Sequence, residues 1–324
     1  MKGARHILQG LAAAAGILFF LNATAAMADE PKKDLALRGD AKCTRCHDEG
    51  DDYPVLAIAQ TRHGVKADSR TPTCTSCHGE SDRHANKPAD VTERPKPDFM
   101  FKGVAKSDAH ALSGQCLNCH ESSKRQHWSG SQHETRDVTC ANCHTIHAAN
   151  DRVLNKVTQP EVCFTCHKDQ RAAIHKISTH PILAGKMGCS DCHNPHGSTG
   201  PTLLVKNNVN ETCYTCHAEK RGPFLWEHSP VVDNCANCHT PHGSVNSSLL
   251  KTRPPWLCQE CHSGDHGAAI NSGANLVPGN ATTVNNLQPF GSQSPRAQTN
   301  ARACLNCHIL IHGSNHPAGA KYQR

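Results

Sequence analysis

The sequence is poor in the residues that fill ordinary protein cores. Aromatic residues make up only 4% of its 324 positions, and hydrophobic residues 37%. A chain of this length normally buries a sizeable apolar core in one or two domains. Because it has too few aromatic and aliphatic side chains for a large core, a group other than side chains must fill much of the interior.

Long hydrophobic runs are missing outside the N-terminus. Residues 1–28 begin with Lys2 and Arg5, continue with an apolar run over 7–21 and end in small residues, which is typical of an export signal. An uncleaved anchor is less favoured, since the run is shorter than the roughly 20 residues of a spanning helix. Beyond it the longest apolar patch, near 55–59, is far too short to span a bilayer. We therefore expect a mature protein that is soluble by itself, lies outside the cytoplasm and has no transmembrane span of its own.

A strong charge of one sign is also missing. The chain has 34 Lys and Arg against 28 Asp and Glu, a formal charge of +6. Loss of Lys2 and Arg5 with the signal leaves 32 against 28, or +4. No basic run with interleaved aromatic residues occurs, so the sequence offers no nucleic-acid interface.

Cysteine, by contrast, is abundant, with 20 residues. In an exported chain this first suggests disulfides, but every cysteine belongs to a Cys-x-x-Cys-His motif. The ten cysteine pairs are Cys43 and Cys46, Cys74 and Cys77, Cys116 and Cys119, Cys140 and Cys143, Cys163 and Cys166, Cys189 and Cys192, Cys213 and Cys216, Cys235 and Cys238, Cys258 and Cys261, and Cys304 and Cys307.

The histidine that follows each cysteine pair distinguishes haem attachment from the other functions of Cys-x-x-Cys motifs. Zinc ribbons and redox dithiols also use Cys-x-x-Cys, yet they do not require histidine at the next position. Covalent attachment of haem c does, because two thiols bind one porphyrin edge and the next residue becomes the proximal iron ligand. The predicted proximal ligands are His47, His78, His120, His144, His167, His193, His217, His239, His262 and His308. The sequence thus predicts ten covalently bound haem c groups that replace the missing core and leave no cysteine for disulfides.

A second set of histidines follows a repeat of two motifs. The first motifs of modules two to five begin at 116, 163, 213 and 258, a period of 45 to 50 residues. Each module adds one histidine after its first motif and one after its second. These predicted distal ligands are His63 and His84, His133 and His147, His180 and His196, His228 and His242, and His266 and His312, with His316 as an alternate in module five.

The spacing of two predicted distal histidines indicates which haem they can reach. In CSDCHNPHGS (189–198) and CANCHTPHGS (235–244) the distal histidine follows the proximal one by three residues. Such a histidine cannot easily reach the opposite face of the same ring, so we expect it to serve a neighbouring haem. Methionine is scarcely available after signal cleavage, and His/His iron has a lower potential than His/Met iron. We expect His110, His127 and His175 to be surface residues.

The remaining sequence predicts little regular structure. Helices are expected around the motifs at 161–175 and 211–220, strand patterns are nearly absent, and Pro, Gly, Asn and Ser interrupt the rest. The expected fold is a multihaem cytochrome c of loops and short α-helices with little or no β structure. Its five two-haem modules would form an elongated row of haems.

The expected organisation has four parts. A signal peptide occupies 1–28, a first module with a proline-rich linker 29–115, three repeated modules 116–257, and a last module with a long insertion 258–324. The insertion at 263–303 is rich in Gly, Asn and Ser, and reads either as a flexible surface loop or as a cap that contacts a partner.

The run from 211 to 261, ETCYTCHAEKRGPFLWEHSPVVDNCANCHTPHGSVNSSLLKTRPPWLCQEC, resembles the MtrA/MtoA/DmsE family of decahaem cytochromes, as do CSDCHNPHGS at 189 and CLNCHILIHGSNHP at 304–317. The likeness is close from about Cys116 onward and looser before it. The family implies a periplasmic cytochrome plugged into an outer-membrane β-barrel porin, which conducts electrons between periplasmic carriers and an extracellular cytochrome or iron mineral. Its members serve both iron reduction and iron oxidation.

Two other functions remain open at the sequence level. The same haems would serve a soluble periplasmic electron shuttle or reservoir that has no porin. A multihaem reductase is less favoured, because catalysis needs an open iron position and the chain has enough histidines to close all ten. We therefore expect an electron-transfer protein and no enzyme.

Overall fold

A computed structural model of the chain describes residues 40–65, 70–102, 107–262, 304–317 and 319–322. The expected signal peptide, the insertion at 263–303 and with it His266 lie outside the described residues. The chain divides into two compact units: the first comprises 1–106 together with Ile146–Asn150, and the second comprises Ser107–Thr145 with Asp151–Arg324.

Within 40–65, 70–102 and 146–150, the first unit forms short helical segments. Its α-helices are α2 (Ala41–Thr44), α3 (Cys74–His78) and α4 (Asp82–Ala85), and its 3-10 helices are η1 (Val55–Gln60) and η2 (Arg62–Gly64).

The second unit repeats such segments around eight motifs. Its α-helices are α5 (Ala109–His120), α6 (Cys140–Cys143), α7 (Gln159–Cys163), α8 (Lys168–Ala173), α9 (Val209–Tyr214), α10 (Ser229–Asp233) and α11 (Trp256–Gln259). Its 3-10 helices are η3 (Ser123–Arg125), η4 (Glu134–Arg136), η5 (Arg152–Leu154), η6 (Cys189–Asp191), η7 (Pro201–Leu203), η8 (Ala218–Lys220), η9 (Cys235–Asn237), η10 (Ser247–Leu249) and η12 (Cys304–Asn306).

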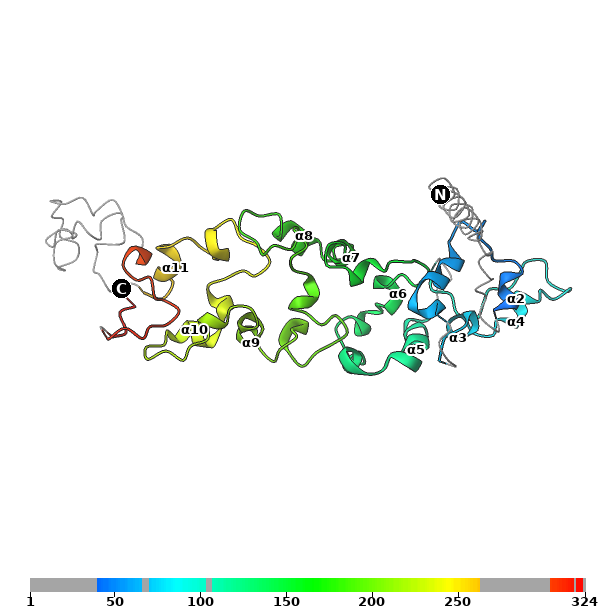
Figure 1. Cartoon of the computed structure of the whole chain (residues 1–324), viewed down its shortest axis with the longest axis horizontal. Coiled ribbons are helices and arrows are strands. Elements are labelled where there is room, and N and C mark those ends of the chain that lie inside the picture. Colours follow the sequence, from blue (N-terminus) through cyan, green and yellow to red (C-terminus); the bar gives the residue numbers. More distant parts are fainter. Residues whose placement is uncertain (1–39, 66–69, 103–106, 263–303, 318, 323–324) are drawn as a thin grey trace, which may run out of the picture. The chain divides into compact units, whose positions relative to one another are not determined.

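This architecture confirms the expected fold class. Figure 1 shows short coils joined by long loops in each unit. Pairing of extended backbone in the described ranges is limited to four isolated bridges, between Ser178 and Ser244, His193 and Leu204, Trp226 and Ser314, and His239 and Leu250. No helix in these ranges is long and apolar enough to cross a membrane.

The two helices expected at 161–175 and 211–220 are wrong as single elements. Each is broken inside its motif, into α7 and α8 in one case and α9 and η8 in the other. The break falls at the motif histidine, where His167 (φ −85°, ψ 68°) and His217 (φ −101°, ψ 48°) leave the helical region. The motif therefore forms a turn between helical segments.

Apolar packing contributes little to the described part of the chain. Its buried hydrophobic side chains are few: Leu112, Trp128, Phe164, Ile174 and Leu204. Buried polar residues outnumber them, and several of these polar side chains form hydrogen bonds between segments that are distant in the sequence.

One set of buried polar residues connects the two motifs of a module. Asp40 Oδ1 accepts a hydrogen bond from the backbone N–H of Cys74 at 2.6 Å, and Asn210 Oδ1 accepts one from Cys235 at 2.7 Å. Gln159 Oε1 accepts one from Ser190 at 3.0 Å. Each acceptor precedes the first motif of its module and caps the start of the second, so it fixes the two motifs against each other.

The His-Gly-Ser triplets connect one module to the next. Ser178 and Ser244 exchange backbone hydrogen bonds of 2.9 and 2.8 Å, and Trp226 and Ser314 exchange two of 2.9 Å. The preceding Gly243 and Gly313 have positive φ, and a Cβ there would collide with the carbonyl of Ala173 or the ring of Phe224. Glycine is required because the two backbones approach closely in a conformation that other residues avoid.

Gly197 is in the same position after His196 and provides a test. Its φ is +107°, and a Cβ would collide with the carbonyl of His127. We predict that Gly197→Ala lowers the free energy of unfolding by ~2 kcal/mol or more, from the unfavourable φ and the overpacking together. Denaturant unfolding of the holoprotein, followed by circular dichroism, measures the loss.

Gly130→Ala is the matched control, since Gly130 has φ +78° and no atom within 4 Å of the added Cβ. It should lose only the cost of the φ angle, roughly 1–2 kcal/mol. Equal losses in the two variants would contradict the close approach at Gly197.

Candidate functional site

The ten motifs share a local turn that brings their functional side chains together. The backbone N–H of the motif histidine donates to the carbonyl of the first cysteine, for example His193 to Cys189 at 3.0 Å and His239 to Cys235 at 3.1 Å. All twenty cysteines lie in the described residues, and none forms a disulfide. The turn therefore presents two thiols and one imidazole as a unit.

Eight of the motif histidines stand opposite one of the additional histidines predicted as distal ligands. The ring centroids of these eight pairs are 6.0 to 6.4 Å apart. The pairs, with the motif histidine first, are His47–His84, His78–His147, His167–His133, His144–His196, His217–His180, His193–His242, His262–His228 and His239–His312.

This separation suits one metal ion between two imidazoles. A metal–imidazole bond of about 2.0–2.1 Å, with about 1.2 Å from nitrogen to ring centre, places two opposed rings about 6.4 Å apart. The rings are too far apart for direct van der Waals stacking, which needs about 3.5–4.0 Å between atoms. The pairs thus fit the two axial positions of a haem iron, and the adjacent cysteines fit its covalent attachment.

Many of the paired histidines, and His308 as well, form a hydrogen bond from Nδ1. The acceptor is a backbone carbonyl for His78, His84, His133, His147, His180, His193, His228, His239 and His308, at 2.5 to 3.1 Å. It is a carboxylate for His47 and His144, which contact Asp51 and Asp151. A hydrogen bond at Nδ1 fixes the ring and leaves Nε2 as the nitrogen for iron.

The pairs follow an exchange between consecutive modules. The histidine after the first motif of a module pairs with the first motif of the next module, as His133 does with His167 and His180 with His217. In return, the histidine after the second motif pairs backward, as His242 does with His193. Only His84 pairs within its own module among the eight, at the N-terminal end of the repeat.

The hydrogen bonds reinforce this exchange. Nδ1 of His133 donates to the carbonyl of Pro195 at 2.8 Å, and Nδ1 of His180 donates to that of Pro241 at 2.8 Å. Each proline immediately precedes the histidine that the next module sends back. The segment that carries the returning histidine therefore also holds the ring that the preceding module contributes. The proline before this histidine, in Asn-Pro-His and Thr-Pro-His, is a repeated sequence signal that the prediction of ligands did not use.

The other predicted site residues are placed as follows. His63, His120 and His308 lie in the described residues outside these eight pairs, and His266 lies beyond them. His312 stands opposite His239, whereas the backbone carbonyl of the alternate, His316, accepts from Trp226 Nε1 at 3.1 Å.

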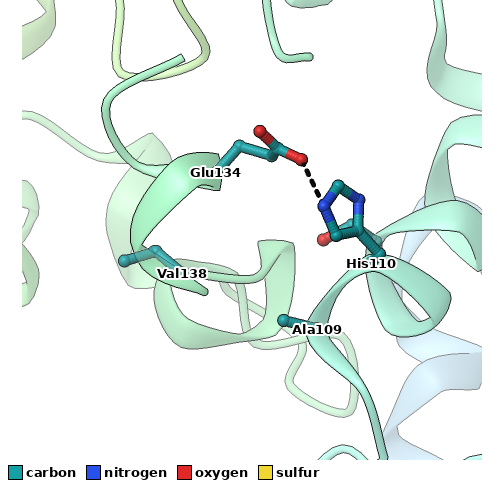
Figure 2. A pocket seen from close by; sticks show the side chains of 5 residues that line it. Ala109, His110, Glu134 and Val138 are labelled. Carbon is teal, nitrogen blue, oxygen red and sulfur yellow. Dashed lines mark ion pairs between the residues drawn. The ribbon is translucent and has the colours of Figure 1, made fainter. Parts of the chain in front are cut away.

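The histidines expected at the surface are exposed. His127 and His175 are exposed, and the side chain of His110 keeps 76% of its surface accessible. Figure 2 shows His110 Nε2 in an ion pair of 2.9 Å with Glu134 Oε1, beside a small pocket lined by Ala109 and Val138. No motif cysteine and no paired histidine lines this pocket.

Burial keeps several distal candidates in the form that binds iron. Burial is the first cause that lowers the pKa of His196 to about 4, and it also lowers the pKa values of His228, His242 and His312. A lowered pKa favours the neutral imidazole at pH 7, and only the neutral ring can be a metal ligand.

Cysteines of consecutive motifs are neighbours in the second unit. Within a module the first cysteines meet: a hydrogen bond with Cys116 is the main cause that lowers the pKa of Cys140 to about 6, and one with Cys163 that lowers the pKa of Cys189 to about 7. Between modules the second cysteines interact. Burial is the first cause that raises the pKa of Cys143, followed by the charge of Cys166.

The same two kinds of contact continue along the unit. Cys213 interacts with Cys235 and Cys258 with Cys304 inside modules, while Cys192 interacts with Cys216 and Cys238 with Cys261 between modules. The eight motifs from Cys116 to His308, called the motif row below, are therefore neighbours in chain order.

Known proteins share these features. The family described as "Doubled CXXCH motif" matches residues 180–222 and 228–267, and "Cytochrome c-type protein NrfB-like" matches 74–157. The multiheme cytochrome MtrA of Shewanella baltica is 45% identical over 291 residues, which cover 89% of this chain and 82% of that protein. The chain belongs to the MtrA family of multihaem cytochromes.

Membership of the MtrA family gives the class of activity. The protein is an electron-transfer cytochrome with ten haem c sites, as the sequence predicted. A more distant relative, the cytochrome c-type protein NrfB of Haemophilus influenzae, is 26% identical over an alignment of 162 positions that covers 44% of this chain and 70% of that protein.

The pairing can be tested at His242, whose ring stands opposite His193. We predict that His242→Ala opens one axial position and produces a high-spin ferric signal from one haem in ten, measured by low-temperature EPR of the oxidised protein. His175→Ala is the control, because His175 is exposed and outside the pairs. An entirely low-spin His242→Ala protein, or an equal signal in both variants, would refute the pairing.

Proposed function

We propose that this protein is the haem-carrying half of a porin–cytochrome conduit in the outer membrane. It would reside in the periplasm, enter a β-barrel porin, and pass electrons between periplasmic carriers and an extracellular cytochrome or iron mineral. The observation that supports this most directly is the motif row, in which each haem attachment site neighbours the next in chain order. A relative named MtrA, alike over most of both chains, points the same way.

The proposed ligand set is the one predicted from the sequence. The twenty motif cysteines attach ten haems, the ten motif histidines are proximal ligands, and the eight pairs supply eight distal ligands. His63 and His266 are the two remaining distal ligands that the sequence predicts. Each haem, once bound, supplies an iron that accepts and releases one electron.

The polypeptide supports this transfer by holding its groups still. The carbonyls that accept from Nδ1 fix the imidazole planes, and the exchange of histidines between modules keeps neighbouring motifs at short range. Transfer between two haems slows steeply with distance, so close and fixed neighbours are what a conduit needs. Two histidines at each haem would leave the iron no position for substrate, which suits electron transfer.

A porin is needed because the chain cannot line a membrane passage by itself. Much of its backbone runs in loops, and polar groups of such backbone would go unsatisfied in lipid. A closed β-barrel with a polar interior satisfies its own backbone and can enclose such a chain.

Purification of the tagged protein from detergent-extracted outer membranes tests the conduit. We predict that a β-barrel protein co-elutes at one copy per copy of this chain. Liposomes that hold the pair should then oxidise an enclosed reduced viologen dye with an external ferric chelate. Liposomes with the porin alone are the control for leakage.

Two results would contradict the conduit. Recovery of the protein as a monomer from the periplasmic fraction alone would leave a soluble shuttle or reservoir. Equal dye oxidation with and without the cytochrome would show that the porin passes the reactants themselves.

A further inference from the structure

Two predicted axial histidines differ in their Nδ1 acceptor from the nine described histidines that donate to a backbone carbonyl. Nine described histidines donate to neutral backbone carbonyls, whereas His47 donates to Asp51 Oδ2 at 3.0 Å and His144 to Asp151 Oδ2 at 2.6 Å. At 3.8 Å, Glu219 lies beyond hydrogen-bond distance of His217 Nδ1. A carboxylate acceptor adds a full negative charge to the hydrogen bond that a carbonyl makes.

Asp151 is the more firmly held of the two aspartates. Its Oδ1 accepts from the backbone N–H groups of Thr145 at 3.2 Å and Val153 at 3.4 Å, which orients Oδ2 toward His144. The side chains of Asp151 and His144 are only 14% and 27% exposed. Asp51 and His47 are more exposed, at 33% and 46%, so solvent screens their interaction more.

The position of Asp151 is taken by a carbonyl in the next two modules. The second motif of module two is backed by Asp151, at the start of η5. In modules three and four the equivalent histidines, His193 and His239, donate to carbonyls inside η7 and η10, at Thr202 and Ser248. Among these three second motifs, that of His144 alone has an anionic acceptor.

The opposite ring of the same pair has a different environment. His196 is paired with His144 at 6.1 Å, and its Nδ1 is buried without a hydrogen-bond partner in the structure. Trp128, whose Nε1 is likewise buried and unpartnered, lies 6.4 Å from His196 between ring centroids. The two sides of this haem site therefore differ in charge: Asp151 lies against His144 and is poorly screened, whereas the cations Lys124 and Arg125 act on His196.

On this geometry, which rests on the ligand pairs of the proposed function, we infer that Asp151 acts through His144 to lower the reduction potential of the haem attached at Cys140 and Cys143. A carboxylate on Nδ1 gives the ring imidazolate character and raises its donation to iron. Stronger donation and a nearby negative charge both stabilise ferric over ferrous iron. Asp151 is a positioning residue and does not touch the iron.

The location of this haem gives the effect a role in conduction. Cys140 contacts Cys116 of the preceding motif and Cys143 interacts with Cys166 of the following one. The haem is thus an interior member of the motif row. Where the neighbouring haems keep higher potentials, the lowered potential makes this haem an uphill step for electrons from either side.

The test needs the potential of one haem among ten, and His196→Ala supplies a marker for it. Removal of that ligand makes the haem of His144 the high-spin one, so its EPR signal can be titrated alone against an applied potential. We predict that adding Asp151→Asn to His196→Ala raises the potential of this signal. The expected change is on the order of tenfold in the ferric-to-ferrous equilibrium, or about 59 mV for a one-electron couple.

Two further variants separate the charge from general disturbance. Asp137→Asn, in the same background, removes a carboxylate from an exposed residue with φ +58°, a conformation that asparagine tolerates, and should leave the titration unchanged. Asp51→Asn, in a His84→Ala background that marks the haem of His47 in the same way, should raise the potential of that haem by a smaller amount. Haem content of every variant is measured alongside.

The outcomes distinguish the inference from the function on which it rests. If His196→Ala gives no high-spin haem, the ligand pair is wrong and the inference falls with it. If the high-spin signal is present but Asp151→Asn leaves its potential unchanged, or shifts it no more than Asp137→Asn does, the pair stands and the role of Asp151 is refuted.

Discussion

The pairing of histidines between consecutive modules is the contact around which this fold is arranged. A module sends one imidazole forward to the next, as His180 does to His217, and receives one back, as His193 does from His242. The described ranges bury only five hydrophobic residues, too few for an apolar core. Bonds from these histidines to iron, together with the thioether bonds of the motifs, can take the place of that core. Under the proposed ligation, stability and conduction would have the same origin, because the histidines that join neighbouring modules would also keep the haems close.

The polypeptide around each pair is specialised for this exchange. Backbone carbonyls orient the rings, serine residues pair the segments that carry them, and glycine permits the contact. Gly243 follows His242 and lies against Ala173, while Ser244 exchanges hydrogen bonds with Ser178, two residues before His180. A short stretch of backbone pairing therefore sets two rings at once, one for each direction of the exchange.

The sequence was sufficient for the chemistry and for the kind of fold. Spacing alone marks all twenty cysteines and their histidines, and the count of remaining histidines predicts two ligands for every iron. It could not assign partners, because His133 and His167 are brought together by the folding of intervening loops that have no periodic pattern. The helices expected at 161–175 and 211–220 failed for a related reason, since the motif turn overrides local helix propensity at His167 and His217. The sequence also gave no sign of the carboxylate at His144. Asp151 accepts the hydrogen bond that a backbone carbonyl accepts in modules three and four, and a backbone acceptor leaves no trace in the residue type.

The most direct measurement of the central claim is a spin count of the fully oxidised native protein by low-temperature EPR, with haem and iron determined on the same sample. Ten irons with two axial histidines each should be low-spin throughout, so the low-spin signals should account for all the haem. A high-spin ferric signal equal to one or more haems per chain would show that at least one iron lacks its second histidine, and the exchange of ligands along the repeat would then be incomplete.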